Sequence, residues 1–148
     1  MRFILFITFL TLQYTILQAQ TIQKFSAEEA HAFLTETNTD SLLIIDGRSD
    51  EMFQSGCINK AINIDAYKDD LASQLDSIKK HQHLFIYCTK STRSDSIINT
   101  LSLLGYKGEI IQMSDGLTGW KANKFELIVP EACKGKEEEE TDQRNTHE

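Results

Sequence analysis

One cysteine of this chain stands among small hydroxyl side chains and two bases. In the stretch YCTKSTRSD, residues 87–95, Cys88 ends an apolar run and precedes a segment with helical periodicity. Lys90 and Arg93 supply the positive charges. The hydroxyl-bearing neighbours are Thr89, Ser91, Thr92 and Ser94. A turn from a strand into a helix offers free backbone N–H groups and the positive end of the helix dipole, so this stretch is suited to bind an anion.

An anion-binding turn of this kind would make Cys88 a nucleophile. The thiolate is the reactive form of cysteine, and helix N-termini with nearby Lys or Arg favour it. A thiolate that takes sulfur from a donor such as thiosulfate becomes a persulfide, and a thiol or cyanide then removes the terminal sulfur. Lys90 would recruit an anionic donor, and Arg93 would bind it or hold the loop. The alternative is that Cys88 is a small buried core residue.

Hydrophobic periodicity predicts buried strands that alternate with helices. Strands are expected at 41–46, 57–65 with its turn, 83–88 and 109–113. Helices are expected at 27–37, 49–56, 66–80, 94–105 and 115–125. Ser26 and Glu29 form a capping box before the first of these helices. The alternation predicts an α/β fold with a mostly parallel sheet flanked by helices, in which ligands bind beyond the carboxyl ends of strands, where Cys88 lies.

The two ends of the chain differ from its middle. Residues 1–19 hold one base, Arg2, then an apolar run and small residues before a cut after Ala19, a pattern typical of a secretory signal peptide. An uncleaved N-terminal membrane anchor is the alternative. Residues 131–148 are acidic and poor in apolar side chains, so we expect a disordered tail. The prediction is an exported protein, periplasmic or extracellular, with one domain at 20–130 and no stable membrane anchor.

Composition narrows the partners and cofactors. The formal net charge of −7 disfavours binding to nucleic acid. The three cysteines, Cys57, Cys88 and Cys133, are an odd number for an exported protein, so one disulfide would leave one free thiol. No pair of cysteines or histidines has the spacing of metal ligands. Neither a metal nor another cofactor is expected.

Over about residues 27–127, the chain resembles a single-domain rhodanese-like protein. The family pattern runs Asp-x-Arg, Glu-x-Phe, Gly-His-Ile-x-x-Ala-x-Asn-Ile, Cys-x-x-Gly-x-Arg-Ser and Gly-x-x-x-Trp. It appears here as DGRSDEMF, GCINKAINI, YCTKSTRS and GLTGW. The resemblance implies a three-layer rhodanese-like sandwich and a persulfide on Cys88, wrapped by the loop from Thr89 to Arg93. It also implies a small sulfur donor and a thiol acceptor, which could be a thiol of a partner protein.

The same resemblance assigns supporting residues and shows three departures. Asp46 and Arg48 resemble a pair beside the active loop, with Arg48 paired to Glu51. Ser91 stands where the family has glycine, so a positive φ there would strain the loop. Asn59 with Lys60 replaces Pro-Gly, and Cys57 replaces a histidine. Cys57 is either a buried core residue or a resolving thiol that forms a disulfide with Cys88 or Cys133.

Three functions fit these residues. The favoured one is sulfur transfer through Cys88. The second is a non-catalytic or redox thiol rhodanese-like binding module. The third is a phosphatase or arsenate reductase, two enzyme groups that resemble rhodanese-like folds. The related phosphatase loop places its arginine six positions beyond the cysteine, whereas Arg93 is five beyond Cys88 and Ser94 occupies the sixth place. The loop therefore favours sulfur over phosphate.

Overall fold

A five-stranded sheet forms the centre of the protein. The computed structural model describes residues 20–130, so the expected signal peptide, the acidic tail and Cys133 lie outside the described residues. The strands are β1 (Thr21–Phe25), β2 (Leu42–Asp46), β3 (Ile62–Asn63), β4 (His83–Tyr87) and β5 (Glu109–Met113). They lie in the order β1-β5-β4-β2-β3, and every neighbouring pair is parallel. The carboxyl ends of all five strands therefore meet at one edge, and the predicted α/β fold is confirmed.

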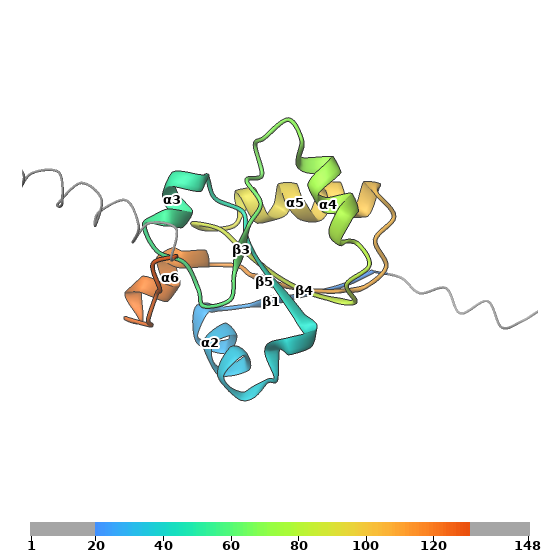
Figure 1. The fold of residues 1–148 in the computed structure, drawn as a ribbon. Coiled ribbons are helices and arrows are strands. Elements are labelled where there is room, and N and C mark those ends of the chain that lie inside the picture. Colours follow the sequence, from blue (N-terminus) through green and yellow to red (C-terminus); the bar gives the residue numbers. More distant parts are fainter. Residues whose placement is uncertain (1–19, 131–148) are drawn as a thin grey trace, which may run out of the picture.

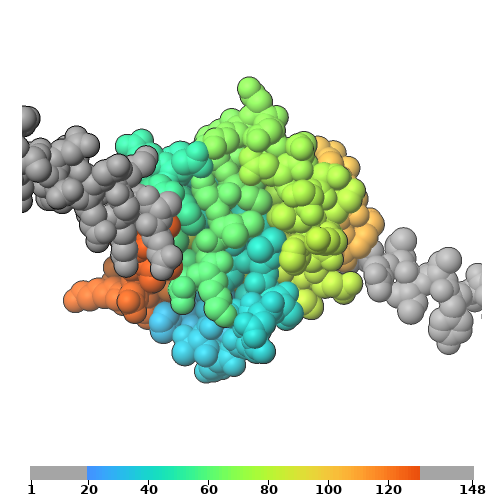
Figure 2. Space-filling model, viewed as in Figure 1, coloured from blue at the N-terminus to red at the C-terminus, as the bar shows by residue number. Residues whose placement is uncertain are grey.

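Helices cover both faces of this sheet (Figure 1). On one face α4 (Leu71–Ile78) packs against α5 (Thr92–Leu103), and on the other α2 (Ala27–Glu36) packs against α6 (Gly116–Ala122). A 3-10 turn, η2 (Thr39–Ser41), precedes β2, and the short helix α3 (Asp50–Gln54) follows β2. Figure 2 shows α2, in blue, and the α4 segment, in light green, on opposite sides of the molecule. Within residues 20–130, no helix is long and apolar enough to cross a membrane.

Strand β4 shows why the sheet needs cover on both sides. Its side chains alternate, so Leu84 and Ile86 join the core under α4 and α5 while Phe85 and Tyr87 join the core under α2 and α6. All four residues are fully buried. This is the continuous apolar run expected of a parallel strand covered on both faces. The strand fixes the position of Cys88, its next residue.

The helix starts follow the capping signals in the sequence. The Ser26 hydroxyl accepts from the Glu29 N–H at 3.2 Å, and the Glu29 carboxylate accepts from the Ser26 N–H at 2.8 Å, so the predicted capping box is confirmed. Ser49 caps α3 by accepting from the Met52 N–H at 3.4 Å. Gly56, just beyond α3, has a φ of +138°, a conformation that suits glycine.

The largest departures from the prediction concern three elements. β1 was not predicted, because it is an edge strand whose residues are mostly exposed and carry no buried alternation. The predicted strand at 57–65 contains only β3, and Cys57 instead forms an antiparallel bridge with Ile128. Helix α4 begins at Leu71 rather than at residue 66, because the Asp65 carboxylate accepts from the Tyr67 N–H at 3.0 Å and holds a turn there.

Candidate active site around Cys88

Cys88 lies immediately after β4, at the carboxyl edge of the sheet, and four residues before α5 begins. Its exposed fraction is 2%. The hydroxyl of buried Ser94 lies 3.3 Å from the Cys88 Sγ and 3.0 Å from the Ser91 carbonyl oxygen. A hydroxyl has one proton, so it donates to one of these acceptors at a time. A negatively charged sulfur would be the stronger acceptor, and Ser94 is thus placed to stabilise it.

Free N–H groups line the turn that follows Cys88. Among residues 20–130, the backbone N–H groups of residues 89–94 have no hydrogen-bond acceptor. Three of them belong to the first turn of α5, where helical N–H groups lack intrahelical partners. Such groups carry partial positive charge, so a bound anion or a charged sulfur can use them.

Two carbonyl groups of the same turn are held by α6. The N–H groups of Leu117 and Thr118 donate to the carbonyl oxygens of Cys88 and Thr89 at 2.9 and 3.0 Å. The Thr118 hydroxyl also donates to the Thr89 carbonyl oxygen at 2.9 Å. Two carbonyl acceptors of the turn are thereby occupied while its N–H donors stay free among the described residues, which favours an anion at the turn. Gly116 permits this contact, because its φ is +56° and a Cβ would lie 2.6 Å from the Cys88 carbonyl oxygen.

Gly116→Ala should therefore destabilise the protein more than the same substitution at Gly105. The added Cβ would meet backbone atoms of the loop, and the residue would also hold a strained positive φ, so we expect a loss of about 2 kcal/mol or more in the free energy of unfolding. Gly105→Ala is the matched control: its φ is +77°, but nothing lies within 4 Å of a Cβ there. Equal losses in urea unfolding of both variants would contradict the role given to Gly116.

Two bases flank the turn on the side of α5. Lys90 is exposed. The Arg93 guanidinium carbon lies 5.1 Å from the centre of the Tyr67 ring, and the Arg93 Nε is buried without a hydrogen-bond partner among the described residues. Tyr67 itself is 62% exposed, in the segment between β3 and α4. The contact between Tyr67 and Arg93 thus holds the Arg93 guanidinium, with its unused donors, beside the turn.

A buried ion pair lies at the end of the neighbouring strand. The Arg48 Nη2 is 2.7 Å from the Asp46 Oδ2, and the two side chains are 3% and 0% exposed. Arg48 Nη2 also donates to the Gly56 carbonyl oxygen at 2.6 Å. The expected pair of Arg48 with Glu51 was wrong, since Arg48 turns back to Asp46 and Glu51 is exposed. The Asp46–Arg48 pair therefore links the end of β2 to the segment after α3.

Cys57 is a buried residue of the core. Its exposed fraction is 1%, and its backbone pairs with Ile128 in both directions at 2.8 Å. Burial raises the pKa of the Cys57 thiol; Asp46 raises it further, and Arg48 opposes the shift. Cys57 and Cys88 are both free thiols in the structure. The core-residue interpretation of Cys57 fits these observations, while a bridge to Cys133 falls outside the described residues.

The same strand end contains a buried phenol. Tyr87 accepts from the Ile58 N–H at 3.0 Å, and burial, with Asp46 nearby, raises the pKa of Tyr87 well above its ordinary value. The phenol therefore stays neutral and fixes the segment after Cys57 against the sheet. Within residues 20–130, no group of three or more His, Cys, Asp or Glu side chains could hold a metal ion.

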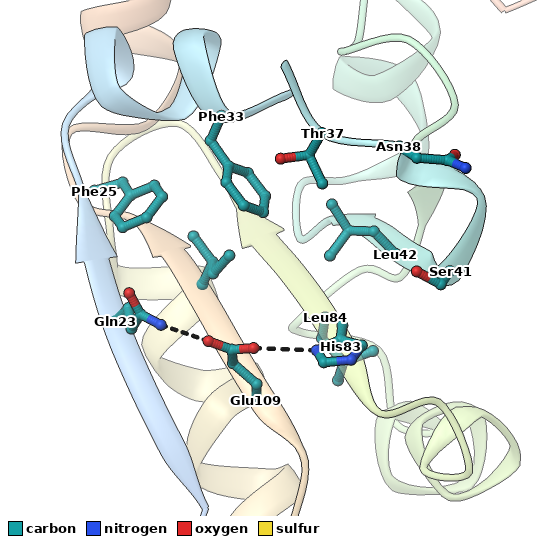
Figure 3. Close-up of a pocket in the computed structure, with 11 residues that line it drawn as sticks. Gln23, Phe25, Phe33, Thr37, Asn38, Ser41, Leu42, His83, Leu84 and Glu109 are labelled. Carbon is teal, nitrogen blue, oxygen red and sulfur yellow. Dashed lines mark hydrogen bonds and ion pairs between the residues drawn. The ribbon is translucent and has the colours of Figure 1, made fainter. Parts of the chain in front are cut away.

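A separate cavity of about 270 Å³ lies at the opposite end of the sheet (Figure 3). Phe25, Phe33 and Leu42 form apolar walls, and Glu109 contacts both Gln23 and His83, with 3.1 Å between its Oε2 and the His83 Nδ1. His83 and Glu109 begin β4 and β5, whereas Cys88 follows the other end of β4. This cavity is therefore not part of the Cys88 site.

Reasoning from the sequence missed several residues near the site, Tyr67 and Lys121 among them. Tyr67 and Lys121 stand in segments that follow the carboxyl ends of β3 and β5. In a parallel sheet those segments share the edge where Cys88 lies. That rule could have pointed to them, but it could not select these side chains among their neighbours.

The comparisons with known proteins agree with this fold. The sequence matches the rhodanese-like domain family over residues 26–123. The match spans more than half of the chain, and the protein therefore belongs to the rhodanese-like family. Among curated proteins, none matches the sequence.

Solved structures of rhodanese-like proteins share this architecture. A rhodanese-like domain protein from Staphylococcus aureus is 24% identical, with a TM-score of 0.60, and the match covers 73% of this chain and 98% of the S. aureus chain. A rhodanese-related protein from Thermoplasma volcanium is 18% identical, with a TM-score of 0.60, and the match covers 73% of this chain and 99% of the T. volcanium chain. A thiosulfate sulfurtransferase from Pseudomonas aeruginosa is 24% identical, with a TM-score of 0.55, and the match covers 72% of this chain and 20% of the P. aeruginosa chain. At these identities the likeness concerns the fold.

Proposed function

We propose that the protein is a sulfurtransferase that carries sulfur on Cys88. The observation that supports this most is the turn after Cys88: within residues 20–130 the N–H groups of residues 89–94 lack acceptors, while α6 binds the carbonyl groups of Cys88 and Thr89. Ser94 adds a hydroxyl donor at 3.3 Å from the sulfur. This arrangement suits a sulfur that is an anion before and after it accepts a second sulfur atom.

The proposed reaction has two steps. The Cys88 thiolate attacks the outer sulfur of thiosulfate, a new S–S bond forms, and sulfite leaves with the electron pair of the old bond. An acceptor, cyanide or a thiolate, then attacks the terminal sulfur of the persulfide. The bond to Cys88 breaks, its electron pair returns to the Cys88 sulfur, and thiocyanate or an organic persulfide leaves. Lys90 and Arg93 attract the anionic donor.

Tyr67 should affect donor binding through Arg93. Tyr67→Leu removes the ring that holds the guanidinium, so we expect the KM for thiosulfate to rise about two- to fivefold with little change in kcat, the size of an exposed cation–π contact. Tyr67→Phe keeps the ring and is the matched control, with a KM near that of the wild type. A Phe variant as impaired as the Leu variant would mean that the phenol hydroxyl, and not the ring contact, matters.

The phosphatase alternative is disfavoured by the packing of the loop. Ser94 occupies the position where that chemistry needs an arginine, and the serine side chain is buried against the sulfur. The non-catalytic module keeps one observation in its favour, since Cys88 is 2% exposed and a donor must reach it.

Turnover assays separate these functions. Reduced protein is incubated with thiosulfate and cyanide, and thiocyanate is measured; p-nitrophenyl phosphate is offered in a parallel assay. Sulfur transfer predicts thiocyanate and no phosphate release. Phosphate release without thiocyanate would replace the proposal with a phosphatase, and neither product would favour the binding module.

We also propose that the protein acts after export, in the periplasm or outside the cell. The pattern of residues 1–19 supports this, with a cut after Ala19. Expression of the full chain in a bacterium, followed by N-terminal sequencing of the periplasmic fraction, tests it. A protein that keeps Met1 and stays in the cell would contradict export.

A further inference from the structure

A pocket of about 280 Å³ lies beside the Cys88 loop, between α3 and α6. We call it the α3–α6 pocket. Its lining residues are Arg48, Met52, Thr89, Leu117, Thr118 and Lys121. Thr89 follows Cys88 directly, and the Leu117 N–H binds the Cys88 carbonyl oxygen at 2.9 Å. The pocket therefore adjoins the reactive loop, yet it includes neither Lys90 nor Arg93.

Three donors in this pocket have no acceptor among residues 20–130. The Thr89 hydroxyl is buried and makes no hydrogen bond within the described part of the chain. Arg48 binds Asp46 and Gly56 through Nε and Nη2, which leaves Nη1 without a partner. Lys121 is exposed and forms no ion pair with any other residue in the described range 20–130. A buried hydroxyl and a guanidinium with unused capacity both favour an incoming anion.

The other walls of the pocket point to an organic anion. None of the six lining residues is acidic, so nothing in the lining competes for the donors. Met52 and Leu117 supply an apolar surface that can contact methylene groups. Thiosulfate has no carbon atoms to use that surface. A short carbon chain that ends in a carboxylate uses both the apolar surface and the donors.

We propose that the α3–α6 pocket binds the carboxylate of a small thiol that accepts sulfur from Cys88, a proposal that rests on the sulfurtransferase function. With its carboxylate near Lys121 and Thr89, the acceptor presents its thiolate to the persulfide. The thiolate attacks the terminal sulfur, a new S–S bond forms, and the bond to Cys88 breaks with its electron pair on the Cys88 sulfur. The products are a carboxylate-bearing persulfide and the free Cys88 thiolate, so the charges balance.

Three thiols of similar size test this proposal. The protein is loaded with thiosulfate, loading is checked by intact mass, and kcat/KM is measured with mercaptoacetate, 2-mercaptoethanol and cysteamine. Each variant is compared with the wild type for the same thiol, so that differences in thiol reactivity cancel. Lys121→Gln should lower kcat/KM for mercaptoacetate about three- to tenfold, as expected for a lost charge-assisted contact, with less than about a twofold change for the other two thiols.

Two further variants sharpen the test. Thr89→Val removes the hydroxyl while keeping the shape of the side chain, and it should also reduce the preference for mercaptoacetate. Lys107→Gln removes the same charge from an exposed site in the loop before β5, at the other end of the sheet. It should behave as the wild type with all three thiols.

The possible outcomes separate a failure of the pocket proposal from a failure of the proposed sulfurtransferase function. A Lys121→Gln protein that loads sulfur normally and keeps its full preference for mercaptoacetate overturns the pocket proposal and leaves the persulfide intact. A change in thiosulfate loading, without a change for mercaptoacetate, assigns the pocket to the donor and also overturns it. A wild-type protein that never loads sulfur refutes the function on which the proposal rests.

Discussion

Cys88→Ser should abolish sulfur transfer. Serine fits the space of cysteine, but its hydroxyl is not ionised near neutral pH and its oxygen cannot carry a persulfide. We expect the rate of thiocyanate formation to fall on the order of 10³-fold or more, the scale of losing a nucleophile. The measurement is steady-state thiocyanate production with thiosulfate and cyanide, after urea unfolding has shown that the variant folds as stably as the wild type.

Cys57→Ala is the matched control for this experiment. Cys57 is 1% exposed and packs in the bridge to Ile128, so its loss should lower stability and leave the transfer rate within a few-fold of the wild type. Transfer that persists in Cys88→Ser, or that disappears in folded Cys57→Ala, would contradict the assignment of Cys88 as the sulfur carrier.

Asp46→Asn should cost more stability than any exposed charge change. The substitution leaves the Arg48 guanidinium buried at 3% exposure with a neutral partner. An uncompensated charge in the interior is expensive, so we expect a loss of about 3–5 kcal/mol in the free energy of unfolding. Urea denaturation measures it, provided that both proteins unfold in one transition.

The chain supplies its own control for this prediction. Asp76 pairs with Lys79 at 2.6 Å, close to the 2.7 Å of the Asp46–Arg48 pair, but both side chains are about half exposed. Asp76→Asn should therefore change the free energy of unfolding by less than about 0.5 kcal/mol. Similar losses of unfolding free energy in the two variants would show that burial does not account for the contribution of the Asp46–Arg48 pair to stability.

Reasoning from the sequence succeeded where local signals and burial agree. The apolar run before Cys88 and the capping box at Ser26 each fixed an element, and both elements are present. β1 carried no such signal, because it lies at the edge and gains its place by pairing with β5 along residues 21–25. Long-range pairing of an exposed strand is not encoded in its own pattern.

The loss of family glycines has a different consequence from the one expected. Ser91 has a φ of −136°, so this position needs no left-handed backbone and the loop is not strained there. The strain falls instead on Lys60, where the family also has glycine and the φ is +64°. The Lys60 Nζ lies 3.3 Å from the Asp40 Oδ1 in an exposed ion pair, and Lys60 is far along the chain from Cys88. Sequence alone names the substituted glycines but not their backbone angles.

The error at Arg48 has a similar origin. The family resemblance implied a pair between Arg48 and Glu51, a residue of α3. Arg48 instead precedes Ser49, the N-cap of α3, so it is not on the helix. Its backbone N–H and its side chain both bind Asp46, and this local geometry decides the partner.

The central claim is that Cys88 carries a persulfide, and one mass measurement tests it most directly. Reduced wild-type protein is incubated with thiosulfate, desalted and measured by intact mass, and the modified peptide is then sequenced. The account predicts a gain of one sulfur atom on the peptide that contains Cys88, lost again on addition of cyanide. An unchanged mass in a folded, fully reduced protein, or an added sulfur on Cys57 alone, would contradict it.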